Sequence, residues 1–261
     1  MQTKPLISVV TVCRNAADTI EATMLSVLNQ TYPRVEYIVI DGGSTDGTAD
    51  IINKYADRLA YWVSEPDRGI YDAMNKGIAV ASGDYVNFMN AGDRFCGDDV
   101  LHRIFACRTV TEDFVAGAAM LGNGRGVWLP VADDFTFADV CNGGGVNHQS
   151  SFIRRPLLAG GYDTSAAIIA DDLFFIDRVV FGGCSYRSLP VIVCIYDTTG
   201  ISSTPSSESQ KREERMRFLA SRLPQRIVRD YTSTKTAAVM NFASRLRRKI
   251  EGLVCLASTR I

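Results

Sequence analysis

The sequence has few of the features that mark metal-stabilised, secreted or membrane-spanning proteins. Its seven cysteines include no C-x-x-C pair, which disfavours a zinc ribbon or a thioredoxin-like motif. Their odd number and irregular spacing favour reduced thiols in a reducing compartment. The sequence contains no run of about 18 apolar residues, so we expect no transmembrane helix. We expect no signal peptide, because the N-terminal segment leads directly into a strand-like run. We therefore expect a cytoplasmic protein.

The glycine-rich segment 41–48, DGGSTDGT, lacks both of the common phosphate-binding fingerprints. It does not end in the G-K-[ST] of a P-loop, and its glycines do not have G-x-G-x-x-G spacing. A dinucleotide-binding loop is therefore disfavoured. What remains is a carboxylate, Asp41, at the end of a strand-like run. It can accept hydrogen bonds from a nucleobase or from ribose hydroxyls, or it can simply cap the turn that follows.

Charge is unevenly distributed along a chain that otherwise has an ordinary globular composition, with 261 residues, 46% hydrophobic and 22% charged. Residues 201–261 contain 13 Lys and Arg against 5 Asp and Glu, a net charge of +8, which leaves −9 for residues 1–200. We expect a main domain over 1–204 and a basic helical extension over 205–261. The extension either packs on the main domain as a solvated helical face or contacts an anionic surface. Segment 237–257 favours the second interpretation, because it mixes apolar and basic residues as interfacial helices do.

Strand-like and helix-like segments alternate over the first 95 residues. Continuous apolar, β-branched runs predict buried strands, and amphipathic runs predict helices. This alternation predicts an α/β fold with a doubly wound mixed sheet, mostly parallel, whose ligand site lies where the C-terminal ends of the strands meet. The predicted strands span 6–12, 35–41, 60–65 and 85–90, and the predicted helices span 17–29, 48–59 and 69–81.

The pattern is less regular from about residue 100 onward. A helix ending near residue 107 is followed by strand-like segments separated by glycine-rich turns, then by an amphipathic helix and a further strand. A polar linker leads to two Arg-rich helical stretches. The predicted strands lie at 114–121, 126–131, within 143–155 and at 186–202, and the predicted helices at 168–183, 211–229 and 236–257.

The stretch VNFMNAGDRF, residues 86–95, begins as a strand and stops at a carboxylate. Asn, Gly and Asp are common in plain turns, so a turn is one interpretation. The other is a metal site, because Mg²⁺ is commonly bound by one or two carboxylates together with substrate phosphates. On that interpretation Asp93 is the ligand of Mg²⁺ or Mn²⁺.

Two further segments contain candidates for proton transfer. Asp171 and Asp172 open the helix predicted at 168–183, where they either favour the helix N-terminus or place one general base in a cleft. Neighbouring helical residues diverge by about 100°, so only one of the two can face a site. His148, one of two histidines, lies in a glycine-rich loop, where it is either structural or functional.

Taken together, these segments resemble the family-2 inverting glycosyltransferases with the GT-A fold. The resemblance extends over about residues 5–200. A narrower likeness, in E-P-D-x-G-I-Y-D-A-M-N-K-G and N-x-G-D, is to the branch found in bacterial exopolysaccharide and lipopolysaccharide gene clusters. The matching segments are PLISVVTVCRNA at 5–16, VEYIVIDGGSTDGT at 35–48, SEPDRGIYDAMNKGIAVASGDYVNFMNAGD at 64–93, and HQSSFIRRPLL, GGYD and IADDLFF within 148–175.

The resemblance implies roles for individual residues, matched position by position. It places contacts to the nucleobase at the first two strand ends and the nucleotide-sugar diphosphate along the third helix and the fourth strand. The implied nucleotide-sugar contacts are Thr11, Asp41, Arg68, Asp72, Asn75 and Asn90; the implied metal ligand is Asp93; and the implied catalytic residues are Asp171 or Asp172 as base, with His148 bordering the diphosphate or the acceptor.

This chain departs from the family pattern in two motifs. The common acidic triplet is reduced to Asn90-x-Gly92-Asp93, which leaves one carboxylate for the metal. The usual Glu-Asp pair of the base motif is replaced by Ala170 followed by two aspartates, so the base is ambiguous by one residue.

The resemblance implies sugar transfer from a nucleoside-diphosphate sugar to a saccharide acceptor that is lipid-linked. We expect this reaction to serve surface polysaccharide biosynthesis at the inner face of the plasma membrane, with peripheral membrane association through the basic C-terminus and no nucleic-acid partner. One alternative is a nucleotidyltransferase, which the absence of a glycine-rich basic loop after the first strand disfavours. The other is a catalytically degenerate partner subunit.

Overall fold

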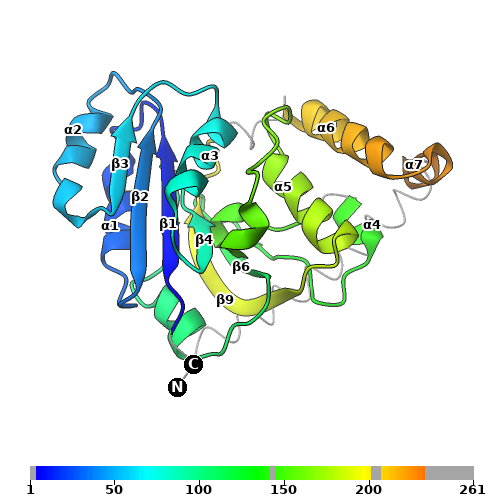
Figure 1. Ribbon diagram of the computed structural model, residues 1–261, viewed down its shortest axis with the longest axis horizontal. Coiled ribbons are helices and arrows are strands. Elements are labelled where there is room, and N and C mark those ends of the chain that lie inside the picture. The colour runs from blue at the N-terminus through cyan, green and yellow to red at the C-terminus, as the bar shows by residue number, and fades with distance from the viewer. Residues whose placement is uncertain (1–3, 142–144, 201–206, 233–261) are drawn as a thin grey trace.

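The computed structural model describes residues 4–141, 145–200 and 207–232, which fold around one curled nine-stranded sheet (Figure 1). Its N-terminal part is parallel, with β1 between β2 and β4 and with β3 at the edge. These strands follow the predicted segments closely. β1 and β4 are buried along their whole length and β2 over most of its length, as continuous apolar runs predict, whereas the edge strand β3 is exposed or half-buried. Their bounds are β1 Ile7–Cys13, β2 Val35–Asp41, β3 Tyr61–Ser64 and β4 Tyr85–Phe88.

The remainder of the sheet is mixed, in the order β3-β2-β1-β4-β8-β6-β9-β5 with β7 paired to β6. β8 is antiparallel to β4 and β6, whereas β6 and β9 are parallel. Strand β5, only two residues long, was not predicted, and it pairs with the end of β9. The bounds are β5 Arg94–Phe95, β6 Phe114–Leu121, β7 Val127–Trp128, β8 Ser151–Arg154 and β9 Tyr186–Tyr196.

Several predicted helices are shorter than expected or are broken. The segment expected as one helix over 48–59 is an α-helix followed by a 3-10 turn, Ala56–Arg58. The stretch 211–229 is two helices, since Pro224 lacks the N–H that would continue the first one. The bounds are α1 Ile20–Leu28, α2 Thr48–Asn53, α3 Ile70–Val80, α4 Phe137–Cys141, α5 Ala170–Phe175 with a π-helical continuation Ile176–Phe181, α6 Ser207–Arg222 and α7 Gln225–Thr232.

Two parts of the sequence-based division lie outside the described residues. The boundary at 204/205 falls within 201–206, and the predicted helix at 236–257 falls within 233–261. Among the described residues, no helix is both long and apolar enough to cross a membrane.

The alternation of side chains along the central strands divides the core into two layers. Val10 and Val12 of β1 belong to the layer that contains α3 and α5, whereas Ile7 and Val9 belong to the layer that contains α1. A Cβ at Gly77 of α3 would lie 2.4 Å from a methyl carbon of Val10, so glycine lets this helix approach the sheet closely.

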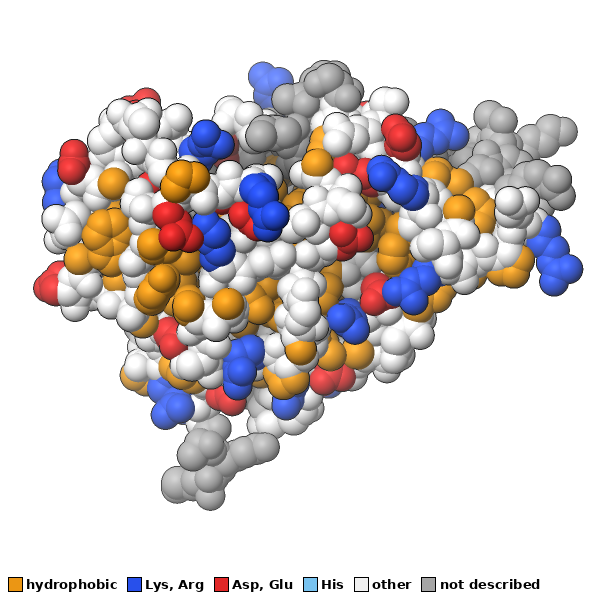
Figure 2. All heavy atoms as spheres, turned by 45° about the horizontal axis from the view of Figure 1, so that its top comes forward, with side chains coloured by type: hydrophobic (Ala, Val, Ile, Leu, Met, Phe, Trp, Pro, Cys, Tyr) orange, Lys and Arg blue, Asp and Glu red, His pale blue; other side chains and the backbone are white. Residues whose placement is uncertain are grey.

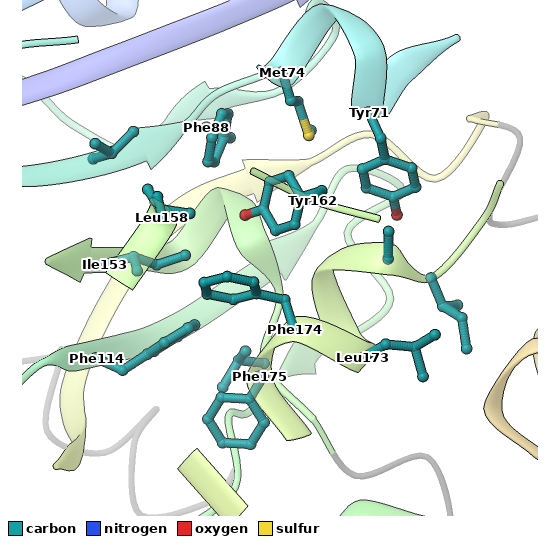
Figure 3. Close-up of a cluster of buried hydrophobic side chains, with 14 of the residues drawn as sticks. Tyr71, Met74, Phe88, Phe114, Ile153, Leu158, Tyr162, Leu173, Phe174 and Phe175 are labelled. Carbon is teal, nitrogen blue, oxygen red and sulfur yellow. The ribbon is translucent and has the colours of Figure 1, made fainter. Parts of the chain in front are cut away.

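Helix α5 is joined to α3 by aromatic packing in the first of these layers. The Tyr162 ring lies between those of Phe88 and Phe174, with centroid separations of 5.5 and 5.3 Å, and meets Tyr71 edge-on at 5.6 Å (Figure 3). Since Tyr71 comes from α3 and Phe174 from α5, this cluster fixes the two helices relative to each other.

The strand order places a topological switch point between β1 and β4. The chain runs outward from β1 through β2 to β3 and then returns to the other side of β1 as β4. In open α/β sheets, ligands bind beyond the carboxyl ends of the strands at such a point. Figure 2 tips this edge toward the viewer and shows acidic and basic side chains interspersed there.

Candidate functional site

Four polar side chains from four separate elements form a continuous hydrogen-bonded chain beyond the carboxyl ends of the parallel strands. The Asn90 amide nitrogen lies 2.9 Å from Nε2 of His148. Nδ1 of that ring lies 2.6 Å from Oδ2 of Asp171, and the Tyr71 hydroxyl donates to Oδ1 of the same carboxylate at 2.5 Å. We call these four residues the Asp171 network. Asn90 follows β4, His148 begins the 3-10 helix His148–Ser150, Asp171 lies in the first turn of α5, and Tyr71 lies in the first turn of α3.

Asp171 is mostly buried, but 16% of its side chain remains exposed to solvent. Burial alone would raise its pKa, but the charge and hydrogen bond of His148 and the hydrogen bond of Tyr71 hold the pKa of Asp171 below its ordinary value. The carboxylate is therefore ionised at neutral pH and retains free lone pairs, as a proton acceptor requires.

The two ring nitrogens of His148 have different partners. Neutral His148 donates its Nδ1 proton to Asp171 and accepts the Asn90 amide at Nε2. Burial lowers the pKa of His148, yet attraction to Asp171 and the hydrogen bond between them raise it above its ordinary value. A protonated ring would need an acceptor at Nε2, which Asn90 can provide by turning its amide, because its oxygen has no other partner.

Asp172 faces away from this network. Its Oδ2 lies 2.5 Å from a guanidinium nitrogen of Arg215 on α6, and its other oxygen lies against Gly145. Burial raises the pKa of Asp172, and the Arg215 charge opposes that rise. The two adjacent aspartates thus have separate partners, and the geometry favours Asp171 over Asp172 as the base.

Asp41 is fully buried at the end of β2 and is held by its own loop. Its carboxylate accepts hydrogen bonds from the Ser44 amide and hydroxyl and from the Ser64 hydroxyl. Burial opposes ionisation, but these hydrogen bonds lower the pKa of Asp41 below its ordinary value. The structure therefore gives Asp41 the capping role that the sequence left open, and its contact to a nucleobase stays a prediction.

Thr11 and Asn75 are also engaged within the protein. Thr11 is fully buried, and its hydroxyl donates to the Met89 carbonyl at 2.8 Å. The amide of Asn75 bonds both the nitrogen and the carbonyl of Tyr162, which ties α3 to the loop before α5. Thr11 is closed off from solvent, whereas Asn75 is half-buried with its amide engaged, and the contacts of both to the nucleotide stay predictions.

Arg68 lies at the opposite extreme of exposure. Its side chain is 86% exposed and bonds Asp72 at 2.8 Å, one turn further along the start of α3. The hydrogen bonds from Arg68 lower the pKa of Asp72. An exposed guanidinium that keeps further N–H donors beside this ion pair is suited to a diphosphate, which is the role predicted for Arg68.

Asp93 is 3% exposed, and both of its oxygens already accept hydrogen bonds. Oδ1 accepts the backbone N–H of Asp197, and Oδ2 accepts the Gln149 amide, each at 2.7 Å. Burial raises the pKa of Asp93 to about 6. The predicted metal ligand therefore also joins the turn after β4 to the end of β9.

A second carboxylate lies beside Asp93 and was not identified from the sequence. A Cβ added at Gly92 would lie 2.7 Å from Oδ2 of Asp197, so this side chain occupies the space that an acid at position 92 would use. Asp197 follows β9 and is partly exposed. No cluster of three or more metal-ligating side chains occurs among the described residues. The Asp197 carboxylate itself accepts hydrogen bonds from the Thr199 hydroxyl and N–H. A divalent cation held by Asp93 and Asp197 would take its other ligands from a diphosphate and water, and Asp93 as a metal ligand stays a prediction.

Tyr71 is the other functional candidate that the sequence analysis missed. It lies within the quoted motif G-I-Y-D-A-M-N, directly before Asp72, so its position in the motif was the available signal. Its hydroxyl meets Asp171 across 100 residues of chain, which no local pattern reveals.

Comparisons with known proteins match this architecture. Residues 8–155 match the sequence family described as Glycosyl transferase family 2. A glycosyltransferase of Mycobacterium tuberculosis (strain H37Rv) is 37% identical over 211 residues, which cover 78% of this chain and 79% of that protein. A PGL/p-HBAD biosynthesis glycosyltransferase of Mycobacterium bovis (strain BCG) is 30% identical over 203 residues, covering 75% and 78%.

Solved structures show the same fold. The mannosyltransferase PcManGT from Pyrobaculum calidifontis, determined with GDP-Man and Mn²⁺, superposes with a TM-score of 0.64 at 19% identity, covering 99% of this chain and 76% of that one. This likeness confirms the predicted Rossmann-like GT-A fold class.

Proposed function

Because the chain belongs to glycosyl transferase family 2, we propose that it moves a sugar from a nucleoside-diphosphate sugar to a hydroxyl of a saccharide acceptor, with inversion at the anomeric carbon. The observation that carries this proposal is the pair of hydrogen bonds that His148 and Tyr71 make to Asp171. Family membership argues against the nucleotidyltransferase alternative. A degenerate partner subunit would have no need of an ionised, partly exposed carboxylate held in this way.

Asp171 acts as the general base. As the acceptor oxygen bonds to the anomeric carbon, Asp171 takes the hydroxyl proton, and the bond from that carbon to the diphosphate oxygen breaks with its electrons leaving on the nucleoside diphosphate. Attack on the face opposite the leaving group inverts the configuration. His148 and Tyr71 keep the carboxylate ionised and fixed in orientation, and Asn90 completes the contact to the ring.

The donor contacts the carboxyl edge of the parallel strands. Arg68 is the exposed cation positioned to meet the diphosphate, and Asp72 orients it. The structurally similar mannosyltransferase was determined with a nucleoside-diphosphate sugar, which supports this donor class without specifying the base or sugar.

Asp93 and Asp197 would hold a divalent cation, Mg²⁺ or Mn²⁺, on the donor diphosphate. Bound there, the cation would neutralise charge on the departing group. The solved neighbour with Mn²⁺ supports the choice of metal. Asp197 follows β9, and its side chain lies where an acid at position 92 would extend, so it would supply the carboxylate that this position lacks.

The acceptor that we propose is a lipid-linked saccharide in bacterial surface polysaccharide or glycolipid assembly, on the cytoplasmic side of the membrane. The relative named for PGL/p-HBAD biosynthesis supports a biosynthetic role, and the lipid link of the acceptor is our own proposal. Basic residues within 237–257 would contact anionic headgroups. Replacing Arg245, Arg247, Arg248 and Lys249 with Gln in the full chain should reduce sedimentation with anionic vesicles; unchanged sedimentation would refute the membrane contact.

The test of the proposed function begins with donor identification. Melting temperatures are measured with a panel of nucleoside diphosphates and nucleotide sugars, with and without Mn²⁺, because a ligand of the folded state raises the melting temperature. The nucleotide sugar that binds is then assayed for hydrolysis and transfer, and NMR of the product gives its anomeric configuration. Binding without turnover would favour the partner-subunit alternative, and retention of configuration would refute the inverting mechanism.

A further inference from the structure

Helix α6, in the basic extension, lies beside α5, the helix that carries Asp171 (Figure 1), and its C-terminal half contacts α5 and the continuation of α5. Arg215 pairs with Asp172 in the first turn of α5, and Arg222 pairs with Asp177 in its continuation. Between them the Phe218 ring meets that of Phe181, with centroids 6.2 Å apart. The described part of the extension therefore packs against the layer that contains α3 and α5.

The most buried charge of α6 is Glu214, with 3% exposure. Its carboxylate accepts hydrogen bonds from three consecutive backbone N–H groups, those of residues 167, 168 and 169, at 3.0, 3.2 and 3.1 Å. Successive N–H groups of this kind form a concave anion site. These N–H groups immediately precede α5, which begins at Ala170, so Glu214 holds the segment that leads into the helix from 45 residues away.

One peptide unit connects Glu214 to the Asp171 network. The N–H of Ile169 bonds Glu214, and the carbonyl of Ile168, the other end of that peptide, lies 2.9 Å from the Tyr71 hydroxyl. This hydroxyl has a single proton, and its shorter contact, 2.5 Å, is to Asp171. Both partners of the hydroxyl are acceptors and share its one proton, so the position of the 168–169 peptide affects how the hydroxyl meets the carboxylate.

We propose that Glu214 is a positioning residue that holds Asp171 in register with Tyr71 and His148 through the 168–169 peptide. Arg215, its neighbour on α6, keeps Asp172 on the opposite side. The importance of this for sugar transfer rests on the proposed function, in which Asp171 is the base. The geometric claim itself is independent of that assignment.

The proposal is tested by titrating His148 by NMR in the full chain, without ligand or metal. The chain has only two histidines, so a His102→Gln spectrum assigns the resonances. His148 is faced by Asp171 from α5 and by Asn90 and Asp93 from the turn after β4. Asp171→Asn gives the pKa of His148 without its partner.

Glu214→Gln should lower the pKa of His148 toward the Asp171→Asn value, because Asp171 no longer holds its place beside the ring. Glu213→Gln is the matched control: it removes the same charge from the neighbouring, exposed position and should leave the titration unchanged. If Glu214→Gln titrates like the wild type, the proposal is overturned. If that variant does not fold, Glu214→Asp, which retains the charge on a shorter side chain, is judged by the same titration.

Transfer kinetics separate the two claims. Glu214→Gln should lower kcat on the order of tenfold, within the contribution of a positioned base, and leave donor affinity unchanged. In the Asp171→Asn background it should add no further loss, because coupled residues are not additive. Full transfer by Asp171→Asn would refute the base assignment alone, whereas an additive loss in the double variant would refute the positioning role.

Discussion

The carboxylates at the strand ends and the carboxylate on α5 are held in opposite ways. Asp41 and Asp93 are 0 and 3% exposed, and their oxygens accept hydrogen bonds from hydroxyl, amide and backbone donors of the loops that they join. Asp171 keeps 16% exposure and is held by two titratable side chains. The first arrangement fixes loop geometry, whereas the second leaves an ionised carboxylate partly open to solvent, as the proposed proton acceptor requires.

The largest expected effect comes from removing the proton acceptor. Asp171→Asn preserves the shape of the side chain but cannot act as a base, so we expect transfer to fall ~10²–10⁴-fold with donor binding intact. Initial rates and donor affinity are the measurements. Asp172→Asn is the matched control at the adjacent position; if it abolishes turnover while Asp171→Asn does not, the base has been misassigned.

On the strand-end side the expected loss is in stability. Asp41→Ala removes a buried acceptor and leaves the donors of Ser44 and Ser64 without it, which should cost about 3 kcal/mol of unfolding free energy. Chemical denaturation measures the change. Asp50→Ala, an exposed carboxylate on α2, should have little effect. Equal stability of both variants would show that Asp41 is not needed to hold its loop.

Asp197 lies between the two classes, because it is partly exposed yet adjoins a buried carboxylate. Asp197→Asn should weaken the Mn²⁺-dependent part of donor binding on the order of tenfold, the size of loss expected for removing one group that orients or binds a metal. Calorimetric titration with the nucleoside diphosphate, with and without Mn²⁺, measures it. An unchanged response to Mn²⁺ in both Asp197→Asn and Asp93→Asn would exclude these carboxylates as ligands.

The pH dependence of stability should differ in sign between His148 and Asp41. The pKa of His148 is raised on folding, so its stabilisation is fully present below its unfolded pKa of about 6.5 and is lost as pH rises through the folded pKa. The pKa of Asp41 is lowered, so its contribution is lost only as pH falls below its unfolded value. The stability difference between wild type and His148→Gln should therefore shrink from pH 6 upward; a constant difference would contradict the raised pKa.

The smallest effect is expected at the exposed edge. Arg68→Ala should leave the melting temperature unchanged, because an exposed ion pair adds little to stability. It should lower donor affinity several-fold if the guanidinium meets the diphosphate. Lys54→Ala, an exposed cation at the end of α2, serves as the control, and equal donor affinity in the two variants would remove Arg68 from the donor site.

The sequence predicted the parallel half of the sheet because local pattern decides it. All seven residues of the run ISVVTVC are buried, so the apolar pattern extends over the whole strand. The ends of β1 and of its partner β2 were therefore predicted to within one residue. Strand β5 has two residues and no such pattern; pairing with β9, about 100 residues later, defines it. Family membership, from matching motifs, was likewise predicted and confirmed.

The partners of the candidate site residues were not predictable in this way. The sequence left the choice between Asp171 and Asp172 open, because adjacent residues share every local signal. Contacts with His148 and Arg215, which lie 23 and 43 positions away, distinguish them. The burial of Thr11 and the presence of Asp197 beside Gly92 follow from how strands are paired, which a linear pattern does not specify.

The Asp197 side chain fills the space beside Gly92, and this restricts how the turn after β4 can be re-engineered. An acid cannot simply be returned to position 92, because the backbone there has φ of 100° and the required space is already filled by Asp197. A designer who wants the common acidic triplet would have to change both strands together, shortening residue 197 and rebuilding the turn after β4. The two positions are therefore coupled, and we expect an acid at position 92 to be less harmful when residue 197 is small than when it is aspartate.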